Sequence, residues 1–184
     1  MERIAVFCGS SEGASAAYKE DAVRLGSLLA QQGITLVYGG SSVGLMGAVA
    51  DTVLAEGGEA IGVIPKKLVE REIAHASLTE LYVVDSMHER KAKMAELSDA
   101  FITLPGGAGT LEEFFEVYTW AQIGIHQKPF GILNTNQYYT PLISLFDHMV
   151  EQKFLKKDNR DMVMVEESPE SLLTNFRSFI SAQN

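Results

Sequence analysis

Short apolar segments of strand length alternate with longer segments of helical periodicity along the whole chain. The alternation predicts an α/β fold: a doubly wound, mostly parallel sheet with helices on both faces, in a single domain of residues 1–184. Residues 66–78 are expected to form a loop with a short helix, and residues 162–165 a short apolar run. The expected strands are residues 4–8, 34–38, 60–64, 81–84, 100–104 and 130–133. The expected helices are residues 15–32, 44–56, 86–97, 109–123, and segments near 140–152 and 169–181.

The composition narrows the class of protein without changing this fold. The net charge of −9 argues against non-specific binding to nucleic acid, which requires a basic surface. The apolar runs are too short to cross a membrane, and the first residues lack the pattern of a secretory signal. Cys8 is the one cysteine, and the histidines lack metal-ligand spacing. We therefore expect a cytoplasmic protein with no metal and no other cofactor.

Three glycine-rich loops follow three of the expected strands, at residues 9–11, 39–44 and 105–110. Ligands of such folds bind beyond the carboxyl ends of the strands, where glycines allow close approach and free N–H groups at a helix start attract an anion. Any one of these loops could be only a tight turn. The 105–110 loop is the strongest candidate for a phosphate site, because it holds three glycines and a threonine in six residues. No Walker sequence or full dinucleotide fingerprint is present, which disfavours a standard ATP or NAD site.

Acidic residues begin the helix that follows the 105–110 loop. Thr110 and Glu113 have the spacing of a capping box, in which Glu113 would only cap its own helix. Alternatively, Glu113 lies one turn from the loop, where its carboxylate could contact a sugar hydroxyl or an attacking water. Glu112 and Glu113 are about 100° apart around a helix, so we expect at most one of them to point into the site. Glu116, one turn further, either supports the site or faces solvent.

A second capping-box pattern, Ser86 with Glu89, opens the preceding helix. Arg90 and Lys91 follow it directly, although the helix macrodipole opposes cations near an N-terminus. A bound anion would favour the two cations at this position. The structural alternative is a solvated basic face that continues to Lys93.

These segments together resemble the LONELY GUY (LOG) family, the cytokinin riboside 5′-monophosphate phosphoribohydrolases, which also carry the label "possible lysine decarboxylase". Residues 105–113 (PGGAGTLEE) match the family motif PGGxGTxxE, and residues 87–91 (MHERK) match its second signature. Residues 38–47 and 120–129 also look like family segments. The resemblance covers nearly the whole chain and is weakest after about residue 155. Two features depart from the commonest pattern: Ser41 stands where a third glycine is usual, and the segment around His75 looks like the bacterial branch.

The resemblance implies a Rossmann-like fold and hydrolysis of the N-glycosidic bond of AMP or N6-prenylated AMP, with the free base and ribose 5-phosphate as products. It implies a homodimer with the site close to the interface. Arg90 and Glu113 carry over as the catalytic pair. The candidate substrate-binding residues, taken from the family motifs and the three loops, are Glu72, Lys91, Gly106, Gly107, Ala108, Gly109, Thr110, Leu111, Glu112, Thr119, Gly9, Ser10, Gly39 and Gly40.

The residue types suit this chemistry. Cleavage of the bond builds oxocarbenium character on the ribose, which the Glu113 carboxylate could stabilise while it orients water. Arg90 could hold the ligand and orient Glu113 through a charge-assisted contact, and a phosphate held at the loop would supply remote binding energy. A non-catalytic carrier of a nucleotide or a phosphate-bearing cofactor is the alternative. A lysine decarboxylase is disfavoured, because Lys91, Lys93 and Lys128 lack a recognisable setting for a pyridoxal phosphate Schiff base.

Overall fold

The computed structural model describes residues 1–69 and 74–183. Seven strands form one sheet in the order β4-β3-β2-β1-β5-β6-β7, and every neighbouring pair is parallel. The predicted doubly wound sheet is confirmed, and the apolar run near residue 164 forms its seventh strand. The strands are β1 (Arg3–Phe7), β2 (Thr35–Tyr38), β3 (Ala60–Pro65), β4 (Glu80–Val84), β5 (Ala100–Thr103), β6 (Phe130–Leu133) and β7 (Met164–Glu166).

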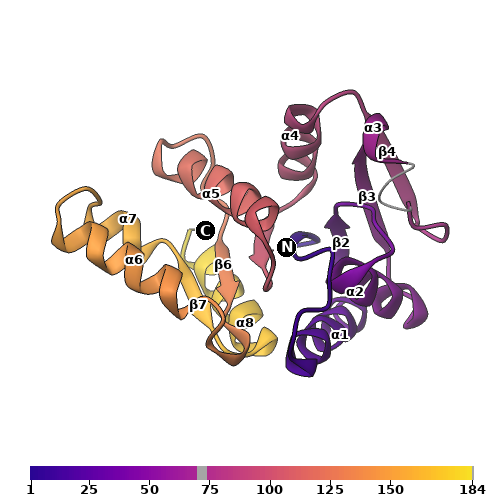
Figure 1. Ribbon diagram of the computed structural model, residues 1–184, viewed down its shortest axis with the longest axis horizontal. Helices are drawn as coiled ribbons and strands as arrows, with labels where there is room; N and C mark the ends of the chain where they lie inside the picture. The colour runs from indigo at the N-terminus through magenta and orange to yellow at the C-terminus, as the bar shows by residue number, and fades with distance from the viewer. Residues whose placement is uncertain (70–73, 184) are drawn as a thin grey trace.

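Helices cover both faces of the sheet, as expected. Helices α1, α2 and α8 pack on one face, whereas α4, α5 and α6 pack on the other (Figure 1). The α7 helix was not predicted from the sequence, because its five residues, KDNRD, carry no apolar periodicity. The helices are α1 (Ala16–Gln31), α2 (Gly44–Ala55), α3 (Lys66–Val69), α4 (Met87–Leu97), α5 (Ala108–Gln122), α6 (Thr140–Glu151), α7 (Lys157–Asp161) and α8 (Pro169–Gln183), with a short 3-10 helix η1 (Thr135–Gln137) before α6.

The central strands are apolar throughout because each of their faces meets a helical layer. In β1, Ile4 and Val6 pack toward α1 and α2, whereas Ala5 and Phe7 pack toward the layer of α4 and α5. The edge strand β4 is different, and its Val83 is 46% exposed. The core therefore lies along the middle of the sheet and includes β1 and β5.

The chain leaves β1 and β5 in opposite directions, although the two strands are neighbours. Helix α1 follows β1 on one face, and α5 follows β5 on the other. The loops after these strands separate at this switch point and open a crevice, where ligands of doubly wound sheets bind. A hydrogen bond from the Gly9 N–H to the Pro105 carbonyl, 3.0 Å long, joins the two loops at the floor of the crevice.

Candidate active site

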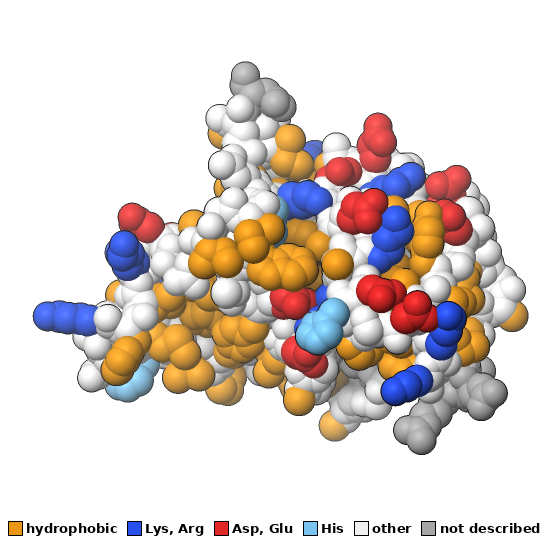
Figure 2. Space-filling view, turned by 90° about the horizontal axis from the view of Figure 1, so that it is seen from above, with side chains coloured by type: hydrophobic (Ala, Val, Ile, Leu, Met, Phe, Trp, Pro, Cys, Tyr) orange, Lys and Arg blue, Asp and Glu red, His pale blue; other side chains and the backbone are white. Residues whose placement is uncertain are grey.

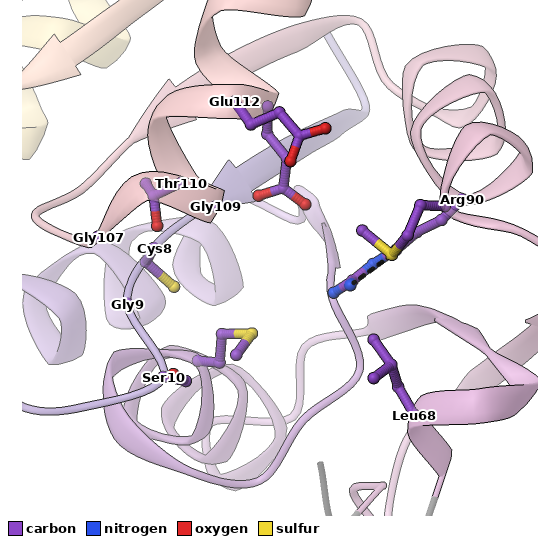
Figure 3. Close-up of a pocket in the computed structure, with 12 residues that line it drawn as sticks. Cys8, Gly9, Ser10, Leu68, Arg90, Gly107, Gly109, Thr110 and Glu112 are labelled. Atoms are coloured by element: carbon purple, nitrogen blue, oxygen red, sulfur yellow. Dashed lines mark hydrogen bonds between the residues drawn. The ribbon is translucent and has the colours of Figure 1, made fainter. Parts of the chain in front are cut away.

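A cavity of about 250 Å³ occupies this crevice. Figure 3 shows the start of α5 and the loop after β1 on one side of the cavity, with Arg90 of α4 reaching in from the other. The lining residues are Cys8, Gly9, Ser10, Met46, Leu68, Met87, Arg90, Gly107, Gly109, Thr110, Glu112 and Glu113. The cavity thus brings together the two predicted catalytic residues and six of the predicted binding residues.

The start of α5 opens directly into the cavity. Gly107 is the N-cap and forms no side-chain cap hydrogen bond, so the first N–H groups of the helix have neither an intrahelical nor a capping side-chain partner. A Cβ atom built on Gly107 or Gly109 meets nothing within 4 Å, which means that these glycines leave open space in front of the N–H groups. Together with the positive end of the macrodipole, this geometry suits an anion.

The capping-box interpretation of Thr110 and Glu113 is wrong. The helix begins at Ala108, so Thr110 lies inside the first turn, where it is only 5% exposed and lines the cavity. Glu113 therefore lies beyond the first three helical residues and cannot cap them. The helix starts earlier than the Thr–Glu spacing suggested, because the extended backbone of Gly107 takes the N-cap position.

Both acidic side chains of this turn reach the cavity, which corrects the expectation that at most one would. Glu113 lines the wall, whereas Glu112 extends to the rim, where its side chain is 61% exposed. The helical angle of about 100° separates their Cβ atoms, but the open end of the cavity is wide enough to meet both.

Arg90 is the buried cation of the site. The residue is 5% exposed, and its Nη2 donates a hydrogen bond to the Gly39 carbonyl at 3.2 Å. A Cβ atom on Gly39 would lie 2.1 Å from that nitrogen, so a larger residue at this position would displace the guanidinium. The alternative of a solvated basic face is therefore wrong for Arg90, because α4 packs this side chain against the loop after β2.

The predicted cap at Ser86 is confirmed, but the Glu89 carboxylate reaches the residue before the N-cap. The Ser86 Oγ accepts a hydrogen bond from the Glu89 N–H at 3.1 Å, and the Glu89 carboxylate accepts one from the Asp85 N–H at 2.9 Å. The first turn of α4 thus has a side-chain cap, which the first turn of α5 lacks.

Lys91 lies beside the cavity rather than in its lining. Its side chain is 9% exposed, and its Nζ lies 3.0 Å from Glu112 and 3.2 Å from Glu116. Burial lowers the pKa of Lys91, but the hydrogen bonds and charges of the two carboxylates raise it further, so the net pKa lies above its ordinary value. The ammonium stays charged and links α4 to α5, and Glu116 thus supports the site.

Two predicted glycines shape the loops from outside the lining. The Gly106 carbonyl accepts a hydrogen bond from the Tyr138 hydroxyl, and a Cβ atom on Gly106 would lie 2.2 Å from the Thr110 Oγ1. Gly40 has a positive φ of 80°, and its carbonyl accepts a hydrogen bond from the His75 N–H at 2.9 Å. Both positions require glycine for packing or conformation.

Three further predicted binding residues within the described chain do not line the cavity. Thr119 lies three turns along α5, where its hydroxyl donates to the Phe115 carbonyl at 2.6 Å. Ala108 and Leu111 belong to the first turn of α5 but contribute no lining side chain. Glu72 lies outside the described residues.

The apolar residues of the cavity wall were not predicted from the sequence. Cys8, Met46, Leu68 and Met87 all line the cavity. Burial raises the pKa of the Cys8 thiol, and the negative charge of Glu113 raises it further, so the thiol stays protonated. Cys8 could have been found, since it ends the first strand directly before Gly9, but Leu68 lies in a segment with no clear pattern.

Among residues 1–69 and 74–183, no group of three or more histidine, cysteine or acidic side chains is arranged to hold a metal ion. No helix in the same part of the chain is long and apolar enough to cross a membrane.

Comparison with known proteins identifies the family of this chain. The family model described as "Possible lysine decarboxylase" matches residues 46–176. A cytokinin riboside 5′-monophosphate phosphoribohydrolase of Arabidopsis thaliana is 48% identical over 180 residues, covering 98% of this chain and 84% of the relative. This chain belongs to the same family. An enzyme of that name from Oryza sativa subsp. japonica is 47% identical, covering 98% of this chain and 74% of the relative. The resemblance to the LOG family is thereby confirmed.

Two solved structures share the fold of this chain. The molybdenum cofactor binding protein of the phototrophic bacterium Rippkaea orientalis superposes with a TM-score of 0.72 at 25% identity, covering 97% of each chain. A molybdenum cofactor carrier protein of Chlamydomonas reinhardtii gives a TM-score of 0.72 at 18% identity, covering 98% of each chain. The second likeness bears on the fold alone.

Proposed function

We propose that this protein hydrolyses the N-glycosidic bond of a purine nucleoside 5′-monophosphate, either AMP or N6-prenylated AMP, and releases the free base and ribose 5-phosphate. The observation that carries the proposal is one cavity lined by Arg90, Glu113 and the open start of α5. The names of the family members from Arabidopsis and rice support the same reaction.

The 5′-phosphate binds at the start of α5 in this proposal. The N–H groups behind Gly107 and Gly109 and the Thr110 side chain face the ligand from one element. A phosphate held there contributes binding energy at a distance from the bond that breaks, and this energy helps to orient the ribose for reaction.

Glu113 is the proposed catalytic carboxylate. It lies one turn beyond the phosphate site on the same helix, which places it near the ribose of a bound nucleotide. A negative charge there stabilises the oxocarbenium character that develops as the base departs, and it orients the attacking water. Arg90 supplies the opposite charge across the cavity and holds the ligand.

The side chains of Met46, Leu68 and Met87 suit the base. They form an apolar part of the wall, and methionine adapts to flat aromatic surfaces. No lysine belongs to the lining among the described residues, which argues against a pyridoxal Schiff base here. The decarboxylase label therefore has no support from the cavity.

Incubation with AMP, N6-isopentenyl-AMP, GMP and CMP tests the proposal. We expect free base and ribose 5-phosphate from one or both adenine nucleotides, with less from GMP and CMP. Tight binding without any turnover would contradict the hydrolase. It would favour a non-catalytic carrier, as in the cofactor-binding protein that shares this fold at 25% identity.

We also propose a cytoplasmic homodimer. Exposed apolar side chains support self-association: Ile123 is 64% exposed, Ile125 63% and Phe154 90%. Figure 2 shows hydrophobic side chains gathered across the face of the molecule that it displays. The single buried thiol of Cys8 suits a reducing compartment. Light scattering at several concentrations should give twice the chain mass, and a monomer at every concentration would contradict the dimer.

A further inference from the structure

Two adjacent tyrosines donate hydrogen bonds to the backbone around the start of the 105–110 loop. The Tyr138 hydroxyl donates to the Gly106 carbonyl at 2.7 Å, and the Tyr139 hydroxyl donates to the Leu104 carbonyl at 2.8 Å. The two acceptors flank Pro105. Neither tyrosine belongs to the lining of the active-site cavity.

The turn that presents these tyrosines is strained. Asn136 (φ 50°) and Gln137 (φ 57°) are consecutive residues in the left-handed region, which non-glycine residues rarely adopt. Asn134 stabilises the turn, because its Oδ1 accepts a hydrogen bond from the Tyr139 N–H at 2.7 Å. Strain of this kind persists only where the surrounding structure holds it, and it often accompanies a functional arrangement.

The bond to Tyr138 determines where the next N–H points. In a trans peptide the carbonyl and the N–H lie on opposite sides, and the described residues contain no cis peptide. Because the Gly106 carbonyl points toward Tyr138, the N–H of Gly107 points away from it. Gly107 lines both the active-site cavity and a second hollow that Tyr138 also lines, and its N–H points to the side away from Tyr138.

We infer that Tyr138 is a positioning residue for phosphate binding: its hydroxyl holds the Gly106–Gly107 peptide with the Gly107 N–H toward the ligand. This inference rests on the proposed function and assigns one of its determinants. The peptide lies between two glycines, whose backbones can rotate at little steric cost. Without the hydroxyl, the peptide is free to turn its carbonyl toward the phosphate, where the partial negative charge would repel it.

The test compares Tyr138→Phe with the matched control Tyr18→Phe. The Tyr18 ring packs edge-on against Tyr138 with centroids 5.6 Å apart, but its hydroxyl is not one of the two that bind the loop carbonyls. Calorimetric titration with ribose 5-phosphate, AMP and adenosine measures the phosphate-dependent part of binding. Steady-state kinetics with AMP separates KM from kcat.

We expect Tyr138→Phe to weaken ribose 5-phosphate and AMP roughly three- to tenfold, the fold-change of one net hydrogen bond, with adenosine unchanged. The KM for AMP should rise more than kcat falls, and Tyr18→Phe should behave as wild type. Equal loss of adenosine and AMP binding, or an unchanged affinity for ribose 5-phosphate, would overturn the inference while leaving the hydrolase intact. Failure of the wild-type protein to bind AMP or ribose 5-phosphate would overturn the proposed function and the inference together.

Discussion

Helices α4 and α5 begin on opposite sides of the same cavity, and each start holds a hydroxyl residue followed three positions later by a glutamate. In α4, Ser86 caps the first turn by accepting a hydrogen bond from the Glu89 N–H, and Glu89 accepts one from the Asp85 N–H just before the helix. In α5, Gly107 takes the N-cap without a side-chain bond, and Thr110 and Glu113 line the cavity instead.

The difference teaches that identical spacing can serve structure in one place and binding in another. A helix start with a side-chain cap has fewer free donors for a ligand, whereas an uncapped start facing a cavity retains them. Gly107 makes the distinction, because the helix begins three residues before the Thr–Glu pattern indicates. The four predictions that follow test this contrast.

The largest expected difference is between Glu113→Gln and Glu89→Gln. Both variants replace a carboxylate by a neutral amide of the same size. Glu113→Gln should reduce kcat for AMP by about 100-fold or more, because the charge that stabilises the oxocarbenium-like state is lost. Glu89→Gln should leave kcat close to wild type and lower only the melting temperature slightly.

Steady-state rates and thermal melts of the two variants check this contrast. A large drop in the melting temperature of Glu113→Gln would indicate that the carboxylate stabilises its own helix. Comparable losses of activity in both variants would remove the distinction between the two helix starts.

The second prediction concerns Gly109, which lies in the first turn of α5. Gly109→Ala should raise stability by about 0.5–1 kcal/mol, because alanine favours the helix and its Cβ meets no neighbour. The same Cβ projects into the proposed phosphate position, so the affinity for AMP should fall roughly tenfold, about the effect of losing one charge-assisted hydrogen bond. Titration and thermal melting measure the two effects on one sample. An alanine that stabilises the protein and leaves AMP affinity unchanged would place the phosphate elsewhere.

The third prediction compares the two hydroxyl residues. Ser86→Ala removes a cap and should cost about 1 kcal/mol of stability, with AMP affinity unchanged. Thr110→Val keeps the shape of a side chain that caps nothing, so its main effect should fall on AMP affinity. Denaturant unfolding and titration measure both variants. The reverse pattern, with Thr110→Val losing stability and Ser86→Ala losing affinity, would contradict the comparison.

The fourth and smallest expected effect is on Cys8. Burial and the charge of Glu113 raise the pKa of its thiol, so iodoacetamide should react slowly and the rate should rise with pH. Glu113→Gln removes the second cause and should lower the pKa, which increases the alkylation rate several-fold at a fixed alkaline pH. Glu89→Gln, whose charge is not among the causes of the shift, is the control. Equal rates in both variants would show that Glu113 does not face the thiol.

Much of the fold was predictable because the central parallel strands are apolar along their whole length, and three of the strands run into a glycine-rich loop. The cap at Ser86 was predictable because it depends only on residues that are neighbours in the chain. The α7 helix was not, because its polar residues depend on side-chain contacts such as that between Arg160 and Asp147.

The motif residues of the candidate site could be predicted from the sequence, whereas the apolar lining residues could not. Arg90, Glu113, Gly107, Gly109 and Thr110 all line the cavity. The pairing of Lys91 with Glu112 and Glu116 depends on how α4 packs beside α5, which no local pattern specifies. The position of Leu68 likewise depends on how α3 packs beside segments that are distant in the chain.

Phosphorus-31 NMR of AMP, added to the wild-type protein and to Glu113→Gln, tests the central claim most directly, because one spectrum reports both binding and cleavage. The account predicts that the wild-type protein converts the AMP resonance to that of ribose 5-phosphate. Glu113→Gln should shift and broaden the AMP resonance without conversion, since the start of α5 still holds the phosphate. Conversion by Glu113→Gln at the wild-type rate, or an unperturbed AMP resonance with both proteins, would contradict the central claim.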